Sequence, residues 1–240
     1  MSGNGVLADQ VDREPGRRDQ HAEDTRRAIL AAARQAFARD GYAGTALEAI
    51  VGPARLTKGA LYHHFKNKAA VLEAVYIEME EELAARVTGA VASAPGGAWA
   101  RMLAALDAFF AASAEPEYVR IVLRDAPLVL GPVHGREIDH AIGLGLVVSL
   151  VTELRDEGLL RPLPVVATAR ILLAAASEVA VAMACADDPA QARRDGTEVL
   201  LAMLDGLRAS PTAGAASGSP ESSTAAPGQA VATTMITRGR

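Results

Sequence analysis

The chain has 240 residues, of which 50% are hydrophobic and 22% are charged, as in an ordinary globular protein with a sizeable core. That length allows one large domain or two small ones. The single cysteine, Cys185, excludes an intrachain disulfide and a zinc site built mainly on cysteines. Because no uncharged apolar run reaches the roughly 18 residues needed to cross a bilayer, and because residues 1–18 lack the apolar core of a signal peptide, we expect a soluble cytoplasmic protein without a membrane partner.

Charge is unevenly distributed along the chain. Between Asp24 and Lys68 there are eight basic and three acidic residues, a net charge of +5, which leaves −10 on the rest of a chain whose total is −5. A basic segment in an otherwise acidic chain indicates a polyanion-binding module joined to a second unit. The alternative is that these basic residues form a solvated helix face.

Both ends of the chain are predicted to be disordered. Residues 1–21 have mixed charge and no periodic apolar positions, which is typical of a disordered arm. Of the 32 residues in 209–240, 25 are Ala, Ser, Thr, Gly or Pro, so this tail has too little apolar surface to offset the entropy of ordering it.

Between the two ends we expect an all-α fold of about nine helices, because good helix formers dominate and alternating β-branched runs are absent. A stripe of apolar residues predicts the first helix: Ile29, Ala32, Ala33, Ala36 and Phe37. Gly41 is expected to end it. Thr45 and Glu48 form a candidate capping box for a short second helix, which must end near Pro53.

Side-chain caps and helix breakers predict the remaining helices. Thr57 is expected to cap a short third helix and Asn67 a long fourth one, running from residue 68 to about residue 91. Further helices are predicted over residues 99–112, 117–124, 136–157, 164–186 and 189–208, with a link broken by proline and glycine at 125–132. Asp187-Asp188-Pro189 is expected to cap the last helix.

Two short helices joined by a tight turn, at about residues 45–64, form a candidate helix-turn-helix. A major groove admits one projecting helix, and Leu56, Leu61 and Phe65 are the apolar residues that would hold the second helix in place. Its other face would present Thr57, Lys58, Ala60, Tyr62 and His63. Gly59 would let the backbone approach phosphates. Lys68 is the first residue of the next helix, where a cation is unfavourable for the helix dipole. An anionic partner would explain a lysine at this position.

The runs TRRAILAAARQAFARDGY and LTKGALYHHFKNKAAVL, with Thr45 between them, resemble the TetR family of bacterial transcriptional regulators over residues 22–82. The resemblance implies an all-helical homodimer whose N-terminal domain binds a palindromic operator in double-stranded DNA. It also implies a DNA-contacting set, with Thr45, Tyr62 and Lys68 on phosphates, Lys58, Gly59 and Ala60 at bases, and His63 and His64 at backbone or bases. Thr57, at the start of the recognition helix, completes the candidate DNA-binding residues.

The chain departs from the family pattern at two positions in the turn. Arg55 stands where the family usually has glycine, so it must either adopt a left-handed conformation at a cost of about 1 kcal/mol or change the turn. Pro53 lies where the second helix would normally continue. Neighbouring residues on a helix point about 100° apart, so His63 and His64 cannot share one ion, and we expect neither a metal nor a cofactor.

Residues 83–208 are expected to form a ligand-binding and dimerisation domain. Large side chains in an alanine-rich body can leave a cavity between helices, with a few convergent polar groups. The candidate ligand-binding residues are Trp99, Met102, Phe109, Phe110, Tyr118, Ile121, Arg124, His140, Leu144, Val148 and Glu178. The acidic run Glu78, Glu80, Glu81 and Glu82 is interpreted as a solvated helix face.

The last two helices, at about 164–186 and 189–208, carry long apolar faces, which predict a two-fold interface with a second copy. We therefore expect a homodimeric DNA-binding regulator, a repressor that an apolar small-molecule effector releases from its operator, and not an enzyme. The alternatives are a constitutive DNA-binding dimer without a ligand, and a helical enzyme tethered to DNA by its N-terminal module. The enzyme alternative needs a catalytic constellation, and no nucleophile elbow is present in the sequence.

Overall fold

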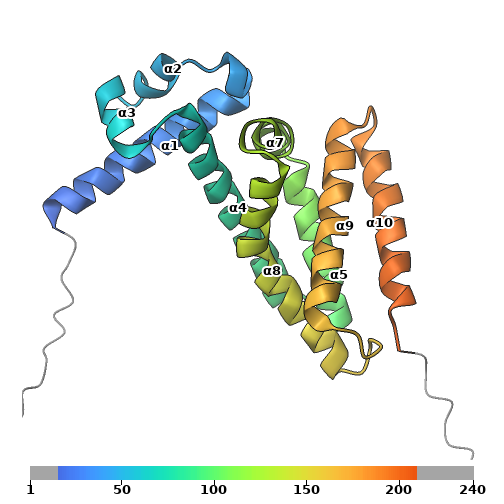
Figure 1. Ribbon diagram of the computed structural model, residues 1–240. Coiled ribbons are helices and arrows are strands. Elements are labelled where there is room, and N and C mark those ends of the chain that lie inside the picture. Colours follow the sequence, from blue (N-terminus) through green and yellow to red (C-terminus); the bar gives the residue numbers. More distant parts are fainter. Residues whose placement is uncertain (1–15, 210–240) are drawn as a thin grey trace, which may run out of the picture. The chain divides into compact units, whose positions relative to one another are not determined.

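The computed structural model describes residues 16–209, and within that range it consists of helices joined by short loops and turns (Figure 1). Nine helices result when the contiguous segments α6, η1 and α7 are counted as one, which confirms the predicted all-α class. The β-type pairing in residues 16–209 is limited to one isolated bridge between Leu160 and Arg208. The expectations for residues 1–15 and 210–240 lie outside the described residues.

Helix α1 (Arg17–Gly44) begins within the predicted arm, so the assignment of residues 17–21 to a disordered segment was wrong. Gly41 interrupts the helix with φ of +72°, a left-handed conformation that glycine adopts without strain. A β-carbon at this position would lie 2.3 Å from the Arg120 guanidinium. Gly41 therefore ends the straight part of α1, as predicted, and also leaves room for a side chain from the C-terminal body.

Helices α2 (Leu47–Val51) and α3 (Lys58–His64) form the helix-turn-helix, and α4 (Lys68–Ser93) follows. The predicted caps of α3 and α4 are confirmed, because the side chains of Thr57 and Asn67 accept hydrogen bonds from backbone N–H groups three residues later. The capping box at Thr45 was wrong, because Ala46 is the N-cap of α2 and makes no side-chain cap. Arg55 adopts φ of +53°, the left-handed conformation expected if the turn keeps the family geometry.

Helix α5 (Ala98–Ser113) leads into a continuous helical stretch formed by α6 (Pro116–Tyr118), η1 (Val119–Asp125) and α7 (Ala126–Leu130). The segment η1 is a π-helix, whose hydrogen bonds span one more residue than those of an α-helix. The predicted broken link at 125–132 was wrong, because α7 is helical and the chain breaks only at Gly131, before α8 (Pro132–Asp156).

Helices α9 (Val165–Cys185) and α10 (Pro189–Gly206) lie side by side, and Asp188 caps α10 as predicted (Figure 1). A β-carbon at Gly196 would lie 2.5 Å from Val179, so this glycine allows the two helices to approach closely. By length and composition α9 could cross a membrane, but buried helices of soluble proteins have the same property.

Helix α4 connects the two parts of the molecule. It packs against α1 in the N-terminal part and against α5, α7 and α8 in the body, while α1 also contacts η1 (Figure 1). One hydrophobic core runs through both parts, from Phe37 and Leu61 to Leu150 and Leu204. The expected domain boundary after residue 82 falls inside α4, so the two parts share a continuous helix.

Candidate functional site

The outer face of α3 carries most of the candidate DNA-contacting residues. Leu61 is fully buried and holds the helix against the core, with Phe65 just beyond its end. The opposite face exposes Thr57, Lys58, Gly59, Tyr62 and His63, while Ala60 and His64 are half-buried. Tyr62 is 52% exposed although it is aromatic. A short helix anchored on one side therefore presents a polar and basic surface on the other.

Lys58 forms an ion pair with Glu48 of α2. The hydrogen bond from this pair raises the pKa of Lys58 and lowers the pKa of Glu48. Both side chains are more than half exposed, so the pair is screened by solvent and contributes little to stability. Lys58 can leave Glu48 for an anionic partner at small cost.

Thr45 occupies a position different from the one that the resemblance implied. Its side chain is 2% exposed, and its hydroxyl donates to the backbone oxygens of Gly41 at 2.7 Å and Ala36 at 3.1 Å. Its backbone N–H donates to Gly41 and Tyr42. The hydroxyl thus binds carbonyls at the end of α1, and its burial leaves it no access to a phosphate.

Lys68 is also used internally. Its Nζ donates to the carbonyl oxygens of Tyr42 at 2.7 Å and Thr45 at 2.9 Å, and it lies 4.2 Å from the centre of the Tyr42 ring. These acceptors explain a cation in the first turn of α4, where we had expected an anionic ligand. Lys68 ties the end of α1 to the start of α4 and so fixes the position of the helix-turn-helix.

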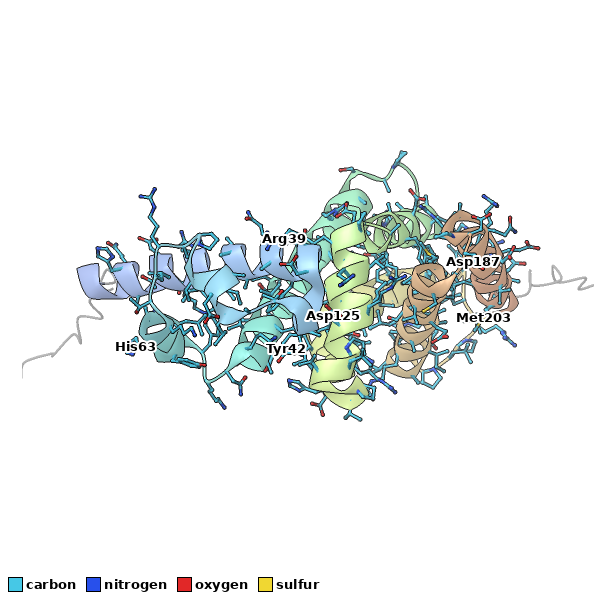
Figure 2. All side chains as sticks on the ribbon, turned by 90° about the horizontal axis from the view of Figure 1, so that it is seen from above. Arg39, Tyr42, His63, Asp125, Asp187 and Met203 are labelled. Atoms are coloured by element: carbon cyan, nitrogen blue, oxygen red, sulfur yellow. The ribbon has the colours of Figure 1, made fainter. Side chains whose placement is uncertain are left out.

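A second junction links α1 to the body. The carboxylate of Asp125 accepts the backbone N–H of Tyr42 at 2.7 Å, and Arg120 lies 3.8 Å from the same carboxylate. Figure 2 shows Tyr42 and Asp125 next to each other, at the point where the end of α1 meets η1. Arg34 adds an ion-pair bridge from α1 to Glu82 and Glu117, at 2.7 and 3.0 Å.

The body contains a cavity of about 610 Å³, within the size range of drug-sized ligand pockets. Helices α4, α5, α8 and α9 line it together with the stretch from Tyr118 to Ala126. Five of the eleven candidate ligand-binding residues are among the lining residues: Met102, Phe109, Tyr118, His140 and Glu178.

The other six candidates lie outside the cavity lining, each for an identifiable reason. Phe110 and Ile121 are buried in the core, with 1% and 0% of their surface exposed. The indole of Trp99 packs under the Arg208 guanidinium, 4.2 Å from the ring centre. Arg124 donates to the carbonyl oxygen of Ala184 at 2.6 Å. Leu144 and Val148 lie half-buried on α8, between the residues of that helix that do line the cavity.

One end of the cavity is formed by acidic and phenolic groups, of which only Tyr118 was predicted from the sequence to bind a ligand. The Tyr118 hydroxyl donates to Glu80 at 2.5 Å, and the Tyr76 hydroxyl donates to Asp139. Burial, with the nearby Asp139 charge, raises the pKa of Glu80 to about 7 against the lowering effect of the Tyr118 hydrogen bond. Glu80 is 8% exposed, so its inclusion in a solvated acidic face was wrong. Its spacing from Tyr76 and Leu83, four and three residues away, was the available signal of an inward position.

The helices predicted to form the dimer interface expose apolar side chains. The exposed fractions are 55% for Val166, 60% for Ile171 and 38% for Val181 on α9, and 61% for Val199 and 42% for Met203 on α10. Only 28% of the most apolar stretch of α9 is buried within one chain. Exposed apolar patches of this kind mark interaction surfaces.

Comparisons with known proteins agree with this architecture. Residues 29–75 match the profile of bacterial regulatory proteins of the tetR family, and residues 99–207 match the tetracyclin repressor-like C-terminal domain. The chain is 37% identical over 65 residues to the HTH-type transcriptional regulator UidR of Escherichia coli, and 40% identical over 65 residues to the HTH-type transcriptional regulator TtgR of Pseudomonas putida. Each match covers 27% of this chain and about a third of the relative (33% and 31%), so the chain spans only that share of the curated relatives' length.

A solved structure extends the likeness over the whole described fold. A TetR-family transcriptional regulator from Pectobacterium atrosepticum is 31% identical to this chain and superposes with a TM-score of 0.71, covering 80% of this chain and 98% of the other. With the helix-turn-helix, the body and both profiles in agreement, the chain belongs to the TetR family of bacterial transcriptional regulators.

Proposed function

We propose that the protein is a homodimeric repressor that binds a palindromic operator through α3 and releases it when a small molecule occupies the cavity. It acts on DNA in the cytoplasm and by binding rather than by catalysis. In this proposal residues up to about 82 form the DNA-binding part, and residues 83–208 form the sensing and dimerising part.

The exposed face of α3 carries the DNA-binding proposal. Thr57, Lys58, Tyr62 and His63 project from a helix short enough to enter a major groove. We assign base reading to Lys58 together with Gly59, Ala60 and His63, and phosphate contacts to Thr57 and Tyr62, with His64 at the edge of this surface. Thr45 and Lys68 support binding indirectly, because their hydrogen bonds hold the helix-turn-helix in position.

The exposed apolar residues of α9 and α10 support the dimer. A second copy packed on these two helices would cover side chains that one chain leaves in water. Two-fold symmetry would also supply two recognition helices, as a palindromic operator requires.

The cavity and the junction at Asp125 support ligand response. Val122 and Leu123 line the cavity, and Asp125, on the same π-helix, holds the Tyr42 amide of α1. A ligand reduces operator affinity to the extent that it prefers the geometry of the DNA-free protein. A hundredfold effect needs a preference of about 2.7 kcal/mol, which is within the usual range of allosteric coupling.

Selection of bound duplexes from random DNA, followed by titration at several salt concentrations, tests DNA binding. We expect a palindromic consensus and an affinity that falls steeply with salt, because neutralised phosphates release counterions. Lys58→Ala should relax the base preference, whereas Glu48→Ala, which removes only the partner of Lys58, should preserve it. Identical behaviour of the two variants would remove Lys58 from the base-reading set, and failure to bind any duplex would overturn the repressor proposal.

Sedimentation analysis tests the dimer. Ile171→Glu places a charge on the exposed apolar face of α9 and should shift the protein towards monomer. Leu128→Glu is the matched control, because Leu128 is 86% exposed on α7, outside the proposed interface. A wild-type monomer at micromolar concentration, or equal effects of both variants, would contradict this interface. A dimer whose DNA affinity no small molecule alters would instead be a constitutive DNA-binding protein.

A further inference from the structure

The acidic end of the cavity is built from three helical segments. Tyr76 and Glu80 lie one turn apart on α4, Tyr118 belongs to α6, and Asp139 belongs to α8. All four residues line the cavity, and the two tyrosines each donate a hydroxyl to one carboxyl group. Tyr76, Glu80 and Tyr118 are each less than a tenth exposed, and Asp139 is half-buried.

Among the residues that the structure describes, no cation acts on Glu80, and only the longer-range charges of Arg136 and His140 act on Asp139. The ion pairs formed within residues 16–209 include neither Glu80 nor Asp139. The groups that act on Glu80 are the Tyr118 hydroxyl and the Asp139 carboxyl. The cavity's basic residues, Arg136 and His140, lie on α8, where they act on Asp139, and Arg136 is exposed.

A buried carboxyl group without a counter-ion is a costly arrangement. Water solvates a carboxylate far better than a protein interior does, so buried acids are ordinarily paired or remain protonated. Tyrosine hydroxyls satisfy the oxygen atoms but carry no positive charge that could balance them. A positive charge placed between Glu80 and Asp139 would therefore stabilise the ionised forms of these groups.

Apart from Arg136, His140, Ser177 and Glu178, the rest of the cavity wall is apolar and suits an apolar ligand body. Met102, Ala105, Phe109, Leu146 and Val147 line it from α5 and α8, and Leu172 and Ala176 line it from α9. A ligand that matched both parts would carry a positive centre at one end and a hydrophobic body at the other. Phenol rings beside the carboxyl groups add surfaces that attract cations.

We propose that the cavity takes a hydrophobic organic cation, with its positive centre between Glu80 and Asp139 and its body against the apolar wall. This proposal names the ligand class of the proposed effector response and rests on that response for its role in regulation. Binding of the cation itself can be measured without DNA. It commits to a charge that the sequence-based expectation of a largely apolar effector did not include.

Two probes of nearly identical size and shape but opposite charge, tetraphenylphosphonium and tetraphenylborate, test the charge preference by calorimetry on the full-length protein. We expect the phosphonium to bind with one site per chain and at least tenfold tighter than the borate. Equal binding, preference for the borate through Arg136 and His140, or no binding of either probe would overturn the proposal.

A pair of glutamate variants tests the position of the site. Glu80→Gln removes the buried charge with little change in shape, and Glu81→Gln makes the same change on the exposed side of α4. We expect Glu80→Gln to weaken the phosphonium about tenfold or more and Glu81→Gln to leave it unchanged. Asp139→Asn should weaken it as well, which provides a second measurement if one variant folds poorly. Equal weakening by Glu80→Gln and Glu81→Gln would show only a general attraction to an acidic protein and would overturn the site.

Proton release supplies an independent readout. Because the pKa of Glu80 is about 7 in the free protein, with Tyr76, Tyr118 and Asp139 around it, a bound cation should stabilise its ionised form. At pH 6 the binding enthalpy should then depend on the ionisation enthalpy of the buffer, and affinity should rise towards pH 8. Both effects should disappear in Glu80→Gln, and their persistence there would contradict the assignment.

The DNA experiment separates this proposal from the proposed function. If the phosphonium binds selectively and weakens operator binding, both hold. If it binds selectively but leaves operator affinity unchanged, the cation site holds and effector-driven release by this ligand class fails. If operator binding responds to neutral or anionic compounds while the phosphonium does not bind, the proposed function holds and the cation site fails.

Discussion

Two polar side chains that hold the helix-turn-helix in place donate to backbone carbonyls, whereas the acidic and phenolic side chains at the cavity wall bond to one another. Thr45 and Lys68 find carbonyl oxygens of Ala36, Gly41, Tyr42 and Thr45. Glu80 and Asp139 accept hydrogen bonds from tyrosine hydroxyls and form no ion pair with any of the described residues. The first arrangement is complete within one chain and fixes the position of the helix-turn-helix. The second buries carboxyl groups at a cost in folding free energy, which a bound ligand can offset.

The largest predicted effect is a stabilisation by Glu80→Gln. Burial holds the native pKa of Glu80 at about 7, above the ordinary glutamate value of 4.5, so the native state binds the proton more tightly than the unfolded state. Stability is then lost as the pH rises from about 4.5 through about 7. Chemical denaturation should show Glu80→Gln to be more stable than wild type by about 3 kcal/mol at pH 8, and by about half of that at pH 5.5. A gain independent of pH would mean that the native cavity does not raise the pKa of Glu80 above its unfolded value.

Removal of the Lys68 side chain should lower the stability of the protein rather than raise it. Lys68→Ala leaves two part-buried carbonyls without their donor and should cost about 2 kcal/mol of unfolding free energy. Lys66→Ala, at an exposed neighbouring lysine, is the control and should change stability by less than about 0.5 kcal/mol. If Lys68→Ala weakened DNA binding without lowering stability, the residue would be a phosphate contact after all.

The junction between the two regions should show a smaller effect on stability. Asp125→Ala removes the acceptor of the Tyr42 amide and should cost about 1–2 kcal/mol in denaturant titration. It should also reduce the influence of a bound cation on operator affinity, measured by fluorescence anisotropy with and without tetraphenylphosphonium. Asp187→Ala, at an exposed position far from this junction in Figure 2, should change neither quantity. Full ligand response in Asp125→Ala would exclude the junction from coupling.

The smallest effect concerns the turn between α2 and α3. Arg55 adopts a left-handed conformation, so Arg55→Gly should be more stable than Arg55→Ala by about 1 kcal/mol, because only alanine keeps the strained β-carbon. Thermal denaturation of the two variants measures this difference while the loss of charge is the same in both. Equal stability would mean that the turn relaxes without strain.

Local chemistry allowed much of the fold to be predicted. Gly41, Thr57, Asn67 and Asp188 each act at a helix end through their own backbone conformation or side chain, so the sequence is sufficient to place them. Thr45 looked like such a cap, but tertiary packing turned its hydroxyl back to α1 instead. The exposed face of α3 was also predictable, since one buried position on so short a helix determines the opposite side.

The cavity was less predictable because its lining depends on which helices meet. Neighbouring residues on α5 illustrate this, since Phe109 faces the cavity and Phe110 faces the core. The π-helix added a second difficulty. Its wider turn changes the angular spacing assumed for an α-helix, and Val122 and Leu123 line the cavity in place of the expected Ile121 and Arg124. Glu80 was missed because its acidic neighbours masked an inward position within an apolar stripe.

The π-helix also has a mechanical consequence. Val122 in the cavity wall and Asp125, which holds the Tyr42 amide, are only three residues apart on η1, less than one turn of the helix. Because Val122 and Asp125 lie on the same turn of η1, they move together, and no hinge between them can absorb a displacement. Any rewinding of η1 that reshapes the cavity must therefore also shift the acceptor on which the end of α1 rests.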